Sequence, residues 1–565
     1  MKKIISLSIL FNLYQLCSTA QNNYVYWVMF KDKNNSAYTI NKPSSYLSEK
    51  AIVRRNNQHI AISESDLPVN ANYVYGVKNA GVTILNKSKW FNAVTVSTGD
   101  TSLLARISQL PYVKNIILLS SPSIKTATPK YKDECNSLKS ISENKSVTAT
   151  ENNVFNYGLS TNQVQQIGVN CLHNRGYQGQ GMTIAYMDDG FYKADSFPAF
   201  DSLRVNNQIL GGYNFVAGNT DLYVHQDVNL SHGMMTFSCS GANLPGHIIG
   251  TAPKAKFWLF VTENYYSESW QEETNWAVAA EFADSVGVDV INSSLGYSIN
   301  MTNPAQNHTY SEMDGRTTII SKAAVLAARK GMLVTSSAGN SGGAPWYKIT
   351  APADADSILT VGAVDSLGFI AGFSSRGPTF DGRIKPNTCA RGVNAAVAST
   401  TGQVWAESGT SFSSPITAGA VACLWQAHPT ATNMQVLYAI ERSASQYFAP
   451  DTIKGFGIPN FCTADSILET ITGISEIQKN SDDNISVYPN PFNSGFTISF
   501  YSETKQNIQI ELYDIAGRRI YNQNKKANAN ANLFNIEDEA AINKGVYLLR
   551  LITTDKIYYK KLVKE

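Results

Sequence analysis

The sequence predicts a multidomain protein in which a small α+β unit, a three-layer α/β domain with a mainly parallel sheet, and a C-terminal β-sandwich follow one another. Three observations predict this fold class. The chain has 565 residues, which is enough for three or four domains. In its middle, short apolar runs such as residues 182–187 end at turns with polar side chains and alternate with helical patterns. From residue 485 onward, short alternating strands follow one another, as is typical of a sandwich.

Residues 1–20 have the pattern of a secretory signal peptide. Two lysines precede an apolar run over residues 4–16, and a site of small residues predicts cleavage after Ala20. Lipidation of Cys17 is a weaker alternative, because Leu16 is a poor residue before a lipidated cysteine. No other uninterrupted apolar run is long enough to span a bilayer, so we expect no transmembrane segment in the mature chain.

The net charge and the cysteine content limit which binding partners and which cross-links we expect. The formal net charge of +2 gives no reason to expect a nucleic acid partner. Six cysteines remain after the predicted cleavage, and this even number allows disulfides outside the cytosol without indicating how they pair. Cys239, Cys389 and Cys423 fall in predicted buried elements, where we expect them to act as small hydrophobic residues.

Residues 21–125 form a separate α+β unit in this prediction. Residues 24–30 and 90–96 alternate like strands, residues 103–107 indicate a helix, and residues 113–118 indicate a last strand. The following linker, residues 126–154, is rich in Lys, Ser, Thr and Asn and has few apolar residues. We therefore expect it to be solvated and open to cleavage.

The stretch around Ser411 is the strongest chemical signal in the chain. Gly409 permits a close turn, and the small and apolar residues that follow predict a buried helix. Pro415 is tolerated in that helix only because it lies near the start. A serine on the first turn lies beside amide groups that could stabilise an oxyanion. The alternative is an ordinary capping serine, which is common.

Three upstream residues supply what a nucleophilic serine needs. Asp188 ends a buried strand, His232 opens a helix of small residues, and Asn340 lies in a glycine-rich turn after an apolar strand. A nucleophile needs a base, and the base needs an acid that orients it. We therefore predict Asp188, His232 and Ser411 as a catalytic triad with Asn340 as the oxyanion donor.

These motifs, in this order, resemble the subtilisin-like serine proteases (subtilases). The resemblance covers roughly residues 155–475. It implies a secreted serine endopeptidase that forms an acyl-enzyme on protein or peptide substrates, with Ser294, Leu295 and Gly296 lining the substrate cleft. It also implies that structural calcium can be present, although no loop has convincing ligand spacing and we predict no metal ligand. The remaining matches lie at residues 188–190, 232–233, 250–255, 338–340 and 373–378.

Some residues depart from the family pattern and leave alternatives open. Asp189 stands where a small residue is usual, and we expect it to point away from the histidine because side chains alternate along a strand. Met234 stands where the family often has threonine. His225 is a rival base, but it lacks the following glycine and the helix of small residues. The alternative function is a surface-displayed binding protein on an inactive protease scaffold.

The flanking regions resemble targeting and maturation modules. Residues 21–125 stand where subtilases carry an inhibitory, chaperone-like prosegment. Residues 481–565 resemble the C-terminal sorting domain of type IX secretion cargo, by the Pro-rich opening at residues 488–491, the turn at residues 514–518 and the basic end. This resemblance implies export through the periplasm to the cell surface or the medium, with the type IX machinery as a partner. The alternative is an accessory sandwich that binds carbohydrate or stabilises the enzyme.

Overall fold

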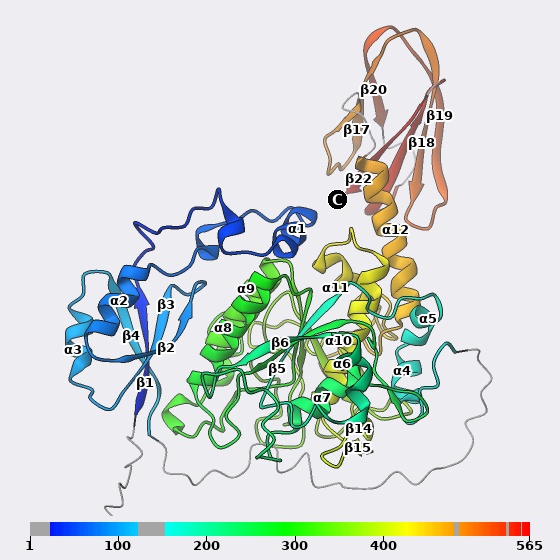
Figure 1. Cartoon of the computed structure of the whole chain (residues 1–565). Helices are drawn as coiled ribbons and strands as arrows, with labels where there is room; N and C mark the ends of the chain where they lie inside the picture. The colour runs from blue at the N-terminus through cyan, green and yellow to red at the C-terminus, as the bar shows by residue number, and fades with distance from the viewer. Residues whose placement is uncertain (1–22, 123–152, 480–484, 538–541, 555) are drawn as a thin grey trace, which may run out of the picture. The chain divides into compact units, whose positions relative to one another are not determined.

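The computed structural model describes residues 23–122, 153–479, 485–537, 542–554 and 556–565 (Figure 1). The chain forms two compact units that divide between Asp465 and Ser466. The predicted signal peptide and nearly all of the predicted linker lie outside the described residues. None of the described helices combines the length and the apolar character that a bilayer crossing needs.

The first unit is built on a seven-stranded sheet in which every neighbouring pair is parallel, in the order β13-β12-β11-β10-β5-β9-β6. This confirms the predicted parallel α/β architecture. Apart from the edge strand β6, most of whose residues are half-buried, the strands are largely buried, as expected for a sheet covered on both faces. They are β5 (Thr183–Asp188), β6 (Ile209–Asn214), β9 (Lys256–Val261), β10 (Val290–Ser293), β11 (Leu333–Ser337), β12 (Leu359–Val364) and β13 (Thr388–Arg391).

Two pairs of helices cover the two faces and make three layers. On β5, Tyr186 turns towards α7 (His232–Gly241), where its ring meets Phe237, and α10 (Thr410–Ala427) packs beside α7. The alternate residues Ala185 and Met187 join the core of α8 (Trp270–Val286) and α9 (Ile319–Arg329). Because successive side chains of β5 point to opposite faces of the sheet, this one strand contributes to the cores on both faces. The remaining elements are α4 (Thr161–Gln166), α5 (Val169–Asn174), α6 (Asp201–Val205), β7 (Asn243–Leu244), β8 (Ile248–Ile249), β14 (Ala395–Ala398), β15 (Val404–Glu407), α11 (Asn433–Arg442) and α12 (Phe461–Lys479).

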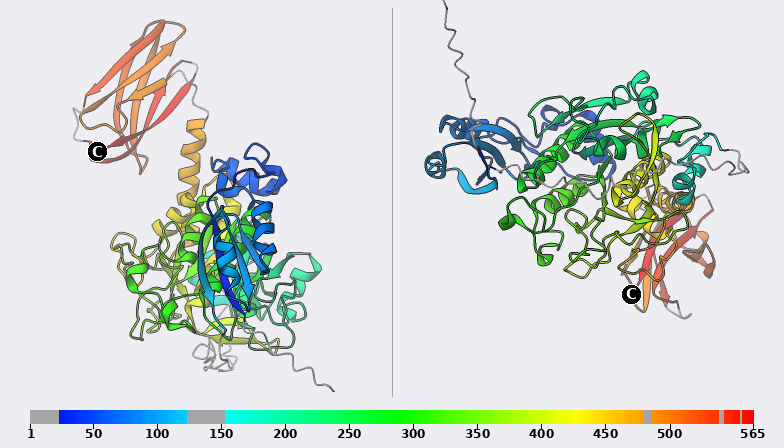
Figure 2. Two further views of the ribbon diagram at one scale, coloured as in Figure 1. Left: turned by 90° about the vertical axis from the view of Figure 1, so that its left-hand side faces the viewer. Right: turned by 90° about the horizontal axis from the view of Figure 1, so that it is seen from below.

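The N-terminal region forms its own antiparallel sheet, in the order β2-β3-β1-β4. One face packs against its own helices, and Trp27 on the other face packs near Trp270 and Ile319 of the central domain. In Figure 2 the blue sheet lies against the green helices. The expected strand at residues 90–96 begins later, because residues 90–92 form a turn. The elements are β1 (Tyr24–Phe30), α2 (Ala71–Asn79), β2 (Thr83–Ser88), β3 (Ala93–Thr98), α3 (Leu103–Ser108) and β4 (Val113–Ser120).

Residues 31–70 leave this sheet after β1 and return to it at α2; we call them the arm. The arm contains α1 (Glu49–Asn57) and two short 3-10 turns, Pro43–Ser45 and Glu64–Asp66. Figure 1 draws α1 in dark blue close to the end of α9. The sequence patterns did not predict this helix.

The C-terminal part of the second unit has two antiparallel sheets, in the orders β16-β17-β20 and β19-β18-β21-β22. Their inner faces share one core, to which β17 contributes Ile498, β18 contributes Ile510 and β21 contributes Leu549. The predicted β-sandwich is confirmed. Its strands are β16 (Ile485–Tyr488), β17 (Gly495–Ser502), β18 (Gln506–Asp514), β19 (Arg519–Ala527), β20 (Asn530–Glu537), β21 (Gly545–Ile552) and β22 (Ile557–Lys564).

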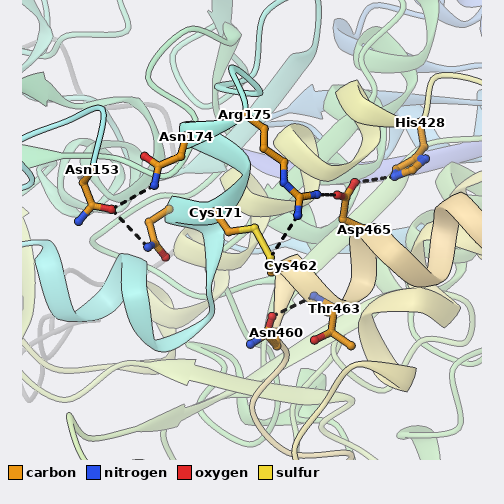
Figure 3. The surroundings of a disulfide bond; sticks show 10 residues. Asn153, Cys171, Asn174, Arg175, His428, Asn460, Cys462, Thr463 and Asp465 are labelled. Atoms are coloured by element: carbon orange, nitrogen blue, oxygen red, sulfur yellow. Dashed lines mark hydrogen bonds and ion pairs between the residues drawn. A yellow bond between two sulfur atoms is a disulfide. The ribbon is translucent and has the colours of Figure 1, made fainter. Parts of the chain in front are cut away.

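A disulfide joins Cys171 on α5 to Cys462 at the start of α12, across 291 positions of sequence (Figure 3). Beside it, Asp465 accepts hydrogen bonds from Arg175 and from His428 Nε2, the latter at 2.7 Å. A helix near the start of the central domain and a helix near its end are therefore held together. The three other cysteines that the structure describes are buried thiols, as predicted: Cys239, Cys389 and Cys423.

Candidate active site

The predicted acid and base form a buried pair. Asp188 is the last residue of β5 and His232 is the first residue of α7, and both side chains are at least 98% buried. His232 Nδ1 lies 2.7 Å from Asp188 Oδ1. Thr236, one helical turn after the histidine, donates from Oγ1 to Asp188 Oδ2 at 3.0 Å. The carboxylate is thus fixed from both sides, and an ionised Asp188 selects the tautomer with the proton on Nδ1.

The neighbouring carboxylate does not lie where alternation predicted. Asp189 Oδ1 accepts a hydrogen bond from Gly233 N at 3.0 Å, and its carboxylate lies within 4.8 Å of the ligand atoms of Asp188 and His232. The expectation that Asp189 points away from the histidine is therefore wrong. The reason is that β5 ends at Asp188, so the alternation does not extend to the next residue. Asp189 instead caps the start of α7, where amide donors and the helix dipole favour a negative charge.

The glycine after the histidine is required by close packing. A Cβ atom on Gly233 would lie 2.4 Å from Gly190 O and 2.8 Å from Asp188 Cβ. Only a residue without a side chain lets α7 start this close to the end of β5. The glycine of the His-Gly motif therefore allows His232 to come within hydrogen-bonding distance of Asp188.

Ser411 is the second residue of α10 and its side chain is buried. The next side chain, Phe412, has its ring 6.2 Å from the His232 ring, between centroids. The first turn of α10 therefore lies near the start of α7, which carries the histidine. Ser411 Oγ also lies 3.4 Å from Ser294 O, which follows β10. The structure thus brings the predicted nucleophile, base and acid to the carboxyl ends of the parallel strands, where active sites of such sheets lie.

Pro415 explains a second role of Ser294. In a regular helix the amide of residue 415 would donate to the carbonyl of Ser411, four residues earlier, but proline has no amide hydrogen. Ser294 Oγ donates to Ser411 O at 2.8 Å and replaces that hydrogen bond. The first turn of α10 is therefore tied to the strand end that is predicted to line the substrate cleft.

The predicted oxyanion donor is oriented by a residue that the sequence analysis did not single out. Asn340 Oδ1 accepts hydrogen bonds from the backbone N and from Oγ1 of Thr410, both at 2.9 Å. Because the amide oxygen is held on Thr410, the orientation of the amide nitrogen is fixed as well. Thr410 immediately precedes Ser411, so the donor and the nucleophile are placed by the same turn.

The other predicted site residues lie in one extended segment. Leu295 and Gly296 continue the chain after β10, and Tyr297 next to them pairs with Ala351 in an isolated antiparallel bridge. Leu295 O accepts from Ser337 Oγ at 3.3 Å. The rival base His225 lies elsewhere: its Nε2 is 2.8 Å from Asp195 in an exposed pair.

One further group of carboxylates could suit a cation. Oxygens of Glu263, Glu268 and Glu272 lie within 4.8 Å of one another. However, Tyr297 donates to both oxygens of Glu263, and Glu272 accepts from two backbone amides, of Asn264 and Ser269. These internal donors account for the placement of both carboxylates, so we assign no ion here. The structural calcium that the sequence resemblance implies stays a prediction.

Comparison with known proteins identifies all three regions. Residues 25–134 match the Peptidase S8 propeptide domain of Bacteroidota, residues 179–457 match the Subtilase family, and residues 486–565 match the secretion system C-terminal sorting domain. Subtilisin E of Bacillus subtilis is 30% identical over 307 residues, which are 54% of this chain and 69% of the relative. Subtilisin of Bacillus pumilus is 30% identical over 307 residues, 54% of this chain and 96% of the relative. Subtilisin Savinase of Lederbergia lenta is 28% identical over 300 residues, 53% of this chain and 95% of the relative.

Proposed function

The chain belongs to the subtilase family of serine peptidases, and from this premise we propose that it is an endopeptidase that cleaves proteins or peptides through Asp188, His232 and Ser411. The observation that carries the proposal is the buried pair of His232 Nδ1 and Asp188 Oδ1 at 2.7 Å. An oriented neutral imidazole beside a helix-borne serine is what general-base activation of a nucleophile requires.

The proposed steps follow from these positions. His232 Nε2 takes the proton of Ser411 Oγ as the serine oxygen attacks the substrate carbonyl carbon. The negative charge that develops on the carbonyl oxygen is stabilised by the Asn340 amide and the Ser411 backbone N–H. His232 then gives its proton to the leaving amine, which yields the acyl-enzyme. Water, activated by the same histidine, hydrolyses that ester and restores Ser411.

A binding protein on an inactive scaffold is the alternative, and the geometry does not favour it. Asp189 leaves the Asp188–His232 pair intact and caps α7. Met234 is fully buried in the core. The two unusual residues therefore have structural roles that do not remove a reacting group.

Labelling of Ser411 tests the proposal. A serine-directed phosphonate should label Ser411 in the processed protein and should not label the Ser411→Ala variant. That variant should also have no peptidase activity. Peptides cleaved at internal bonds, identified by mass spectrometry of a digested peptide library, would establish endopeptidase action. Release of single terminal residues, or wild-type turnover by the alanine variant, would refute the proposal.

The chain carries a propeptide and a sorting domain that directs it to the cell surface or the extracellular space by type IX secretion. We propose boundaries for the parts: a signal peptide over residues 1–20, a prosegment over 21–125, a linker over 126–154, the peptidase domain over 155–475 and the sorting domain over 481–565. The proposed order of events is removal of the signal peptide, passage through the periplasm and cleavage in the linker.

A further inference from the structure

The arm touches the peptidase domain at the edge of the central sheet where the strands begin. Lys50 Nζ donates to Oγ1 of Thr183, the first residue of β5, at 2.7 Å. It also forms an ion pair at 2.7 Å with Asp289, which directly precedes β10. Asp188 and Ser294 lie at the other ends of these two strands. The arm is therefore separated from the candidate active site by the length of the strands and does not cover the catalytic residues.

A buried carboxylate of the peptidase domain is neutralised by cations of the prosegment. Asp284 on α8 is completely buried, and Arg54, Arg55 and Lys89 contact its oxygens at 2.5, 2.7 and 3.2 Å. Burial alone would raise the pKa of Asp284, but the three cations lower it to about 2. A carboxylate in this position would be very unfavourable without them. The surface of α8 is therefore shaped for a basic partner.

The arm also presents an acid to the peptidase domain. Asp66 is fully buried and forms ion pairs with Arg55 of the arm at 2.9 Å and with Lys330 of the peptidase domain at 2.8 Å. Lys330 Nζ further donates to Ser65 Oγ at 2.7 Å. Each side of the interface thus contributes both an acidic and a basic side chain, and this pattern specifies one orientation of the arm.

The backbones fit closely as well. Gly287, which ends α8 with φ +85°, would with a Cβ atom lie 2.7 Å from Lys50 Cβ. Gln58, at the end of α1, donates to Gly331 O at 2.8 Å and accepts from Asn433 N at 3.0 Å. The arm consequently contacts the ends of α8 and α9 and the start of α11, three elements that are distant in sequence.

We propose that the arm is a second anchor of the prosegment, which keeps the cleaved prosegment bound to the base of the peptidase domain, so that detachment of the arm limits the release of free enzyme. The first anchor is the contact of the N-terminal sheet with α8 and α9. When one anchor opens, the other keeps the prosegment close to the peptidase domain. The open anchor therefore binds again before the prosegment escapes. The role assigned to release rests on the proposed peptidase function; the anchoring itself does not.

The test uses a chain that cannot process itself. Full-length protein with Ser411→Ala and a recognition site for a foreign protease inside residues 126–152 is purified, cut with that protease and followed by native mass spectrometry. The cut prosegment should remain bound after dilution. With Lys50→Ala and Gln58→Ala added, the prosegment should dissociate about tenfold faster or more. The reason is that Asp289, Gly331 and Asn433 of the peptidase domain then lose their contacts with the arm.

Matched variants control for the loss of side chains as such. Lys42→Ala with Asn57→Ala removes an exposed lysine and an exposed amide of the arm that lie outside the described contacts with the peptidase domain. This pair should leave the dissociation rate within about twofold of the unmodified arm. If the double variant at Lys50 and Gln58 does not accumulate, Lys50→Ala alone serves, since its side chain is 40% exposed.

Two results would overturn the proposal: immediate loss of the prosegment when the linker is cut, or equal dissociation rates for the contact and control variants. Neither result depends on catalysis, because the cut is made by a foreign protease and Ser411 is absent. A failure of the proposed function would appear separately, as missing phosphonate labelling of a chain that retains Ser411.

Discussion

At the scale of single residues, the adjacent aspartates Asp188 and Asp189 have different structural roles. Asp188 orients His232, whereas Asp189 caps the helix on which the histidine stands. The capping oxygen of Asp189 accepts from a backbone amide, a contact that an asparagine side chain can also make. The Asp188 contact is different, because an amide there can donate to the histidine and favours the wrong tautomer.

We therefore predict that the same substitution has a large effect at Asp188 and a small one at Asp189. Asp188→Asn should lower kcat by roughly 10⁴-fold, the loss known for this change in a catalytic triad. Asp189→Asn should change kcat by less than about tenfold. Steady-state kinetics of the two processed variants on one peptide substrate make the comparison. Equal losses, or a larger loss for Asp189→Asn, would contradict the assignment.

A second residue-scale prediction concerns the oxyanion donor. Asn340→Ala should lower kcat by roughly 10²–10³-fold with little change in KM, as removal of this donor does in a subtilisin. Thr410→Val should cause a smaller loss in kcat, because it keeps the backbone N–H that holds Asn340 Oδ1 and removes only the hydroxyl. A change confined to KM in either variant would show a contact with the bound substrate instead.

At the scale of elements, the catalytic residues could be predicted from the sequence because each stands in a local motif. A strand end, a helix start and a glycine turn place Asp188, His232 and Asn340 without knowledge of distant contacts. Thr236 and Thr410 were missed, since a threonine within a helix carries no signal of its own. Spacing could have indicated Thr236, which stands four residues after His232 and so shares its helix face.

The arm was missed for a different physical reason. Helix α1 carries Arg54 and Arg55, and such a pair usually marks a solvated face. Here both side chains are buried because Asp284, more than 200 positions later, neutralises them. A pattern of burial that depends on a distant charge cannot be recovered from local hydrophobic periodicity.

A buried acid between the two folded regions predicts a pH dependence. Glu281 on α8 accepts from Ser88 Oγ and Lys89 N, each at 2.6 Å, and from Trp90 N at 3.0 Å. Burial raises its pKa to about 7 from an ordinary 4.5, although Lys89 and these hydrogen bonds lower it in part. Removal of the prosegment would expose the carboxyl group to water and return its pKa towards the ordinary value.

The sign of the effect follows from proton binding. Between pH 4.5 and 7 the bound state holds more protons at Glu281 than the free state, so this residue strengthens binding as the pH falls and weakens it as the pH rises to 7. The affinity of the cut prosegment for the Ser411→Ala protein should change on the order of 10²-fold or less across this window. Glu281→Gln should abolish that part of the pH dependence. A pH profile unchanged by this substitution would exclude Glu281 as its source.

At the scale of the whole molecule, the sorting sandwich has its own core and its own sheets. Removal of residues 481–565 should therefore leave a folded, active peptidase that stays in the periplasm. Activity assays on cell fractions provide the measurement. Active enzyme at the cell surface would show that the tail is not the export signal, and aggregated protein would show that the tail is needed for folding.

The bond between Cys171 and Cys462 closes the chain into a covalent ring that contains Asp188, His232, Asn340 and Ser411. Tension applied to the polypeptide on either side of this ring passes directly from one cysteine to the other. The hydrogen bonds of the seven-stranded sheet then lie outside the load path. The disulfide therefore protects the sheet from forces that pull on the chain outside the ring, and a single proteolytic nick inside the ring leaves both fragments attached.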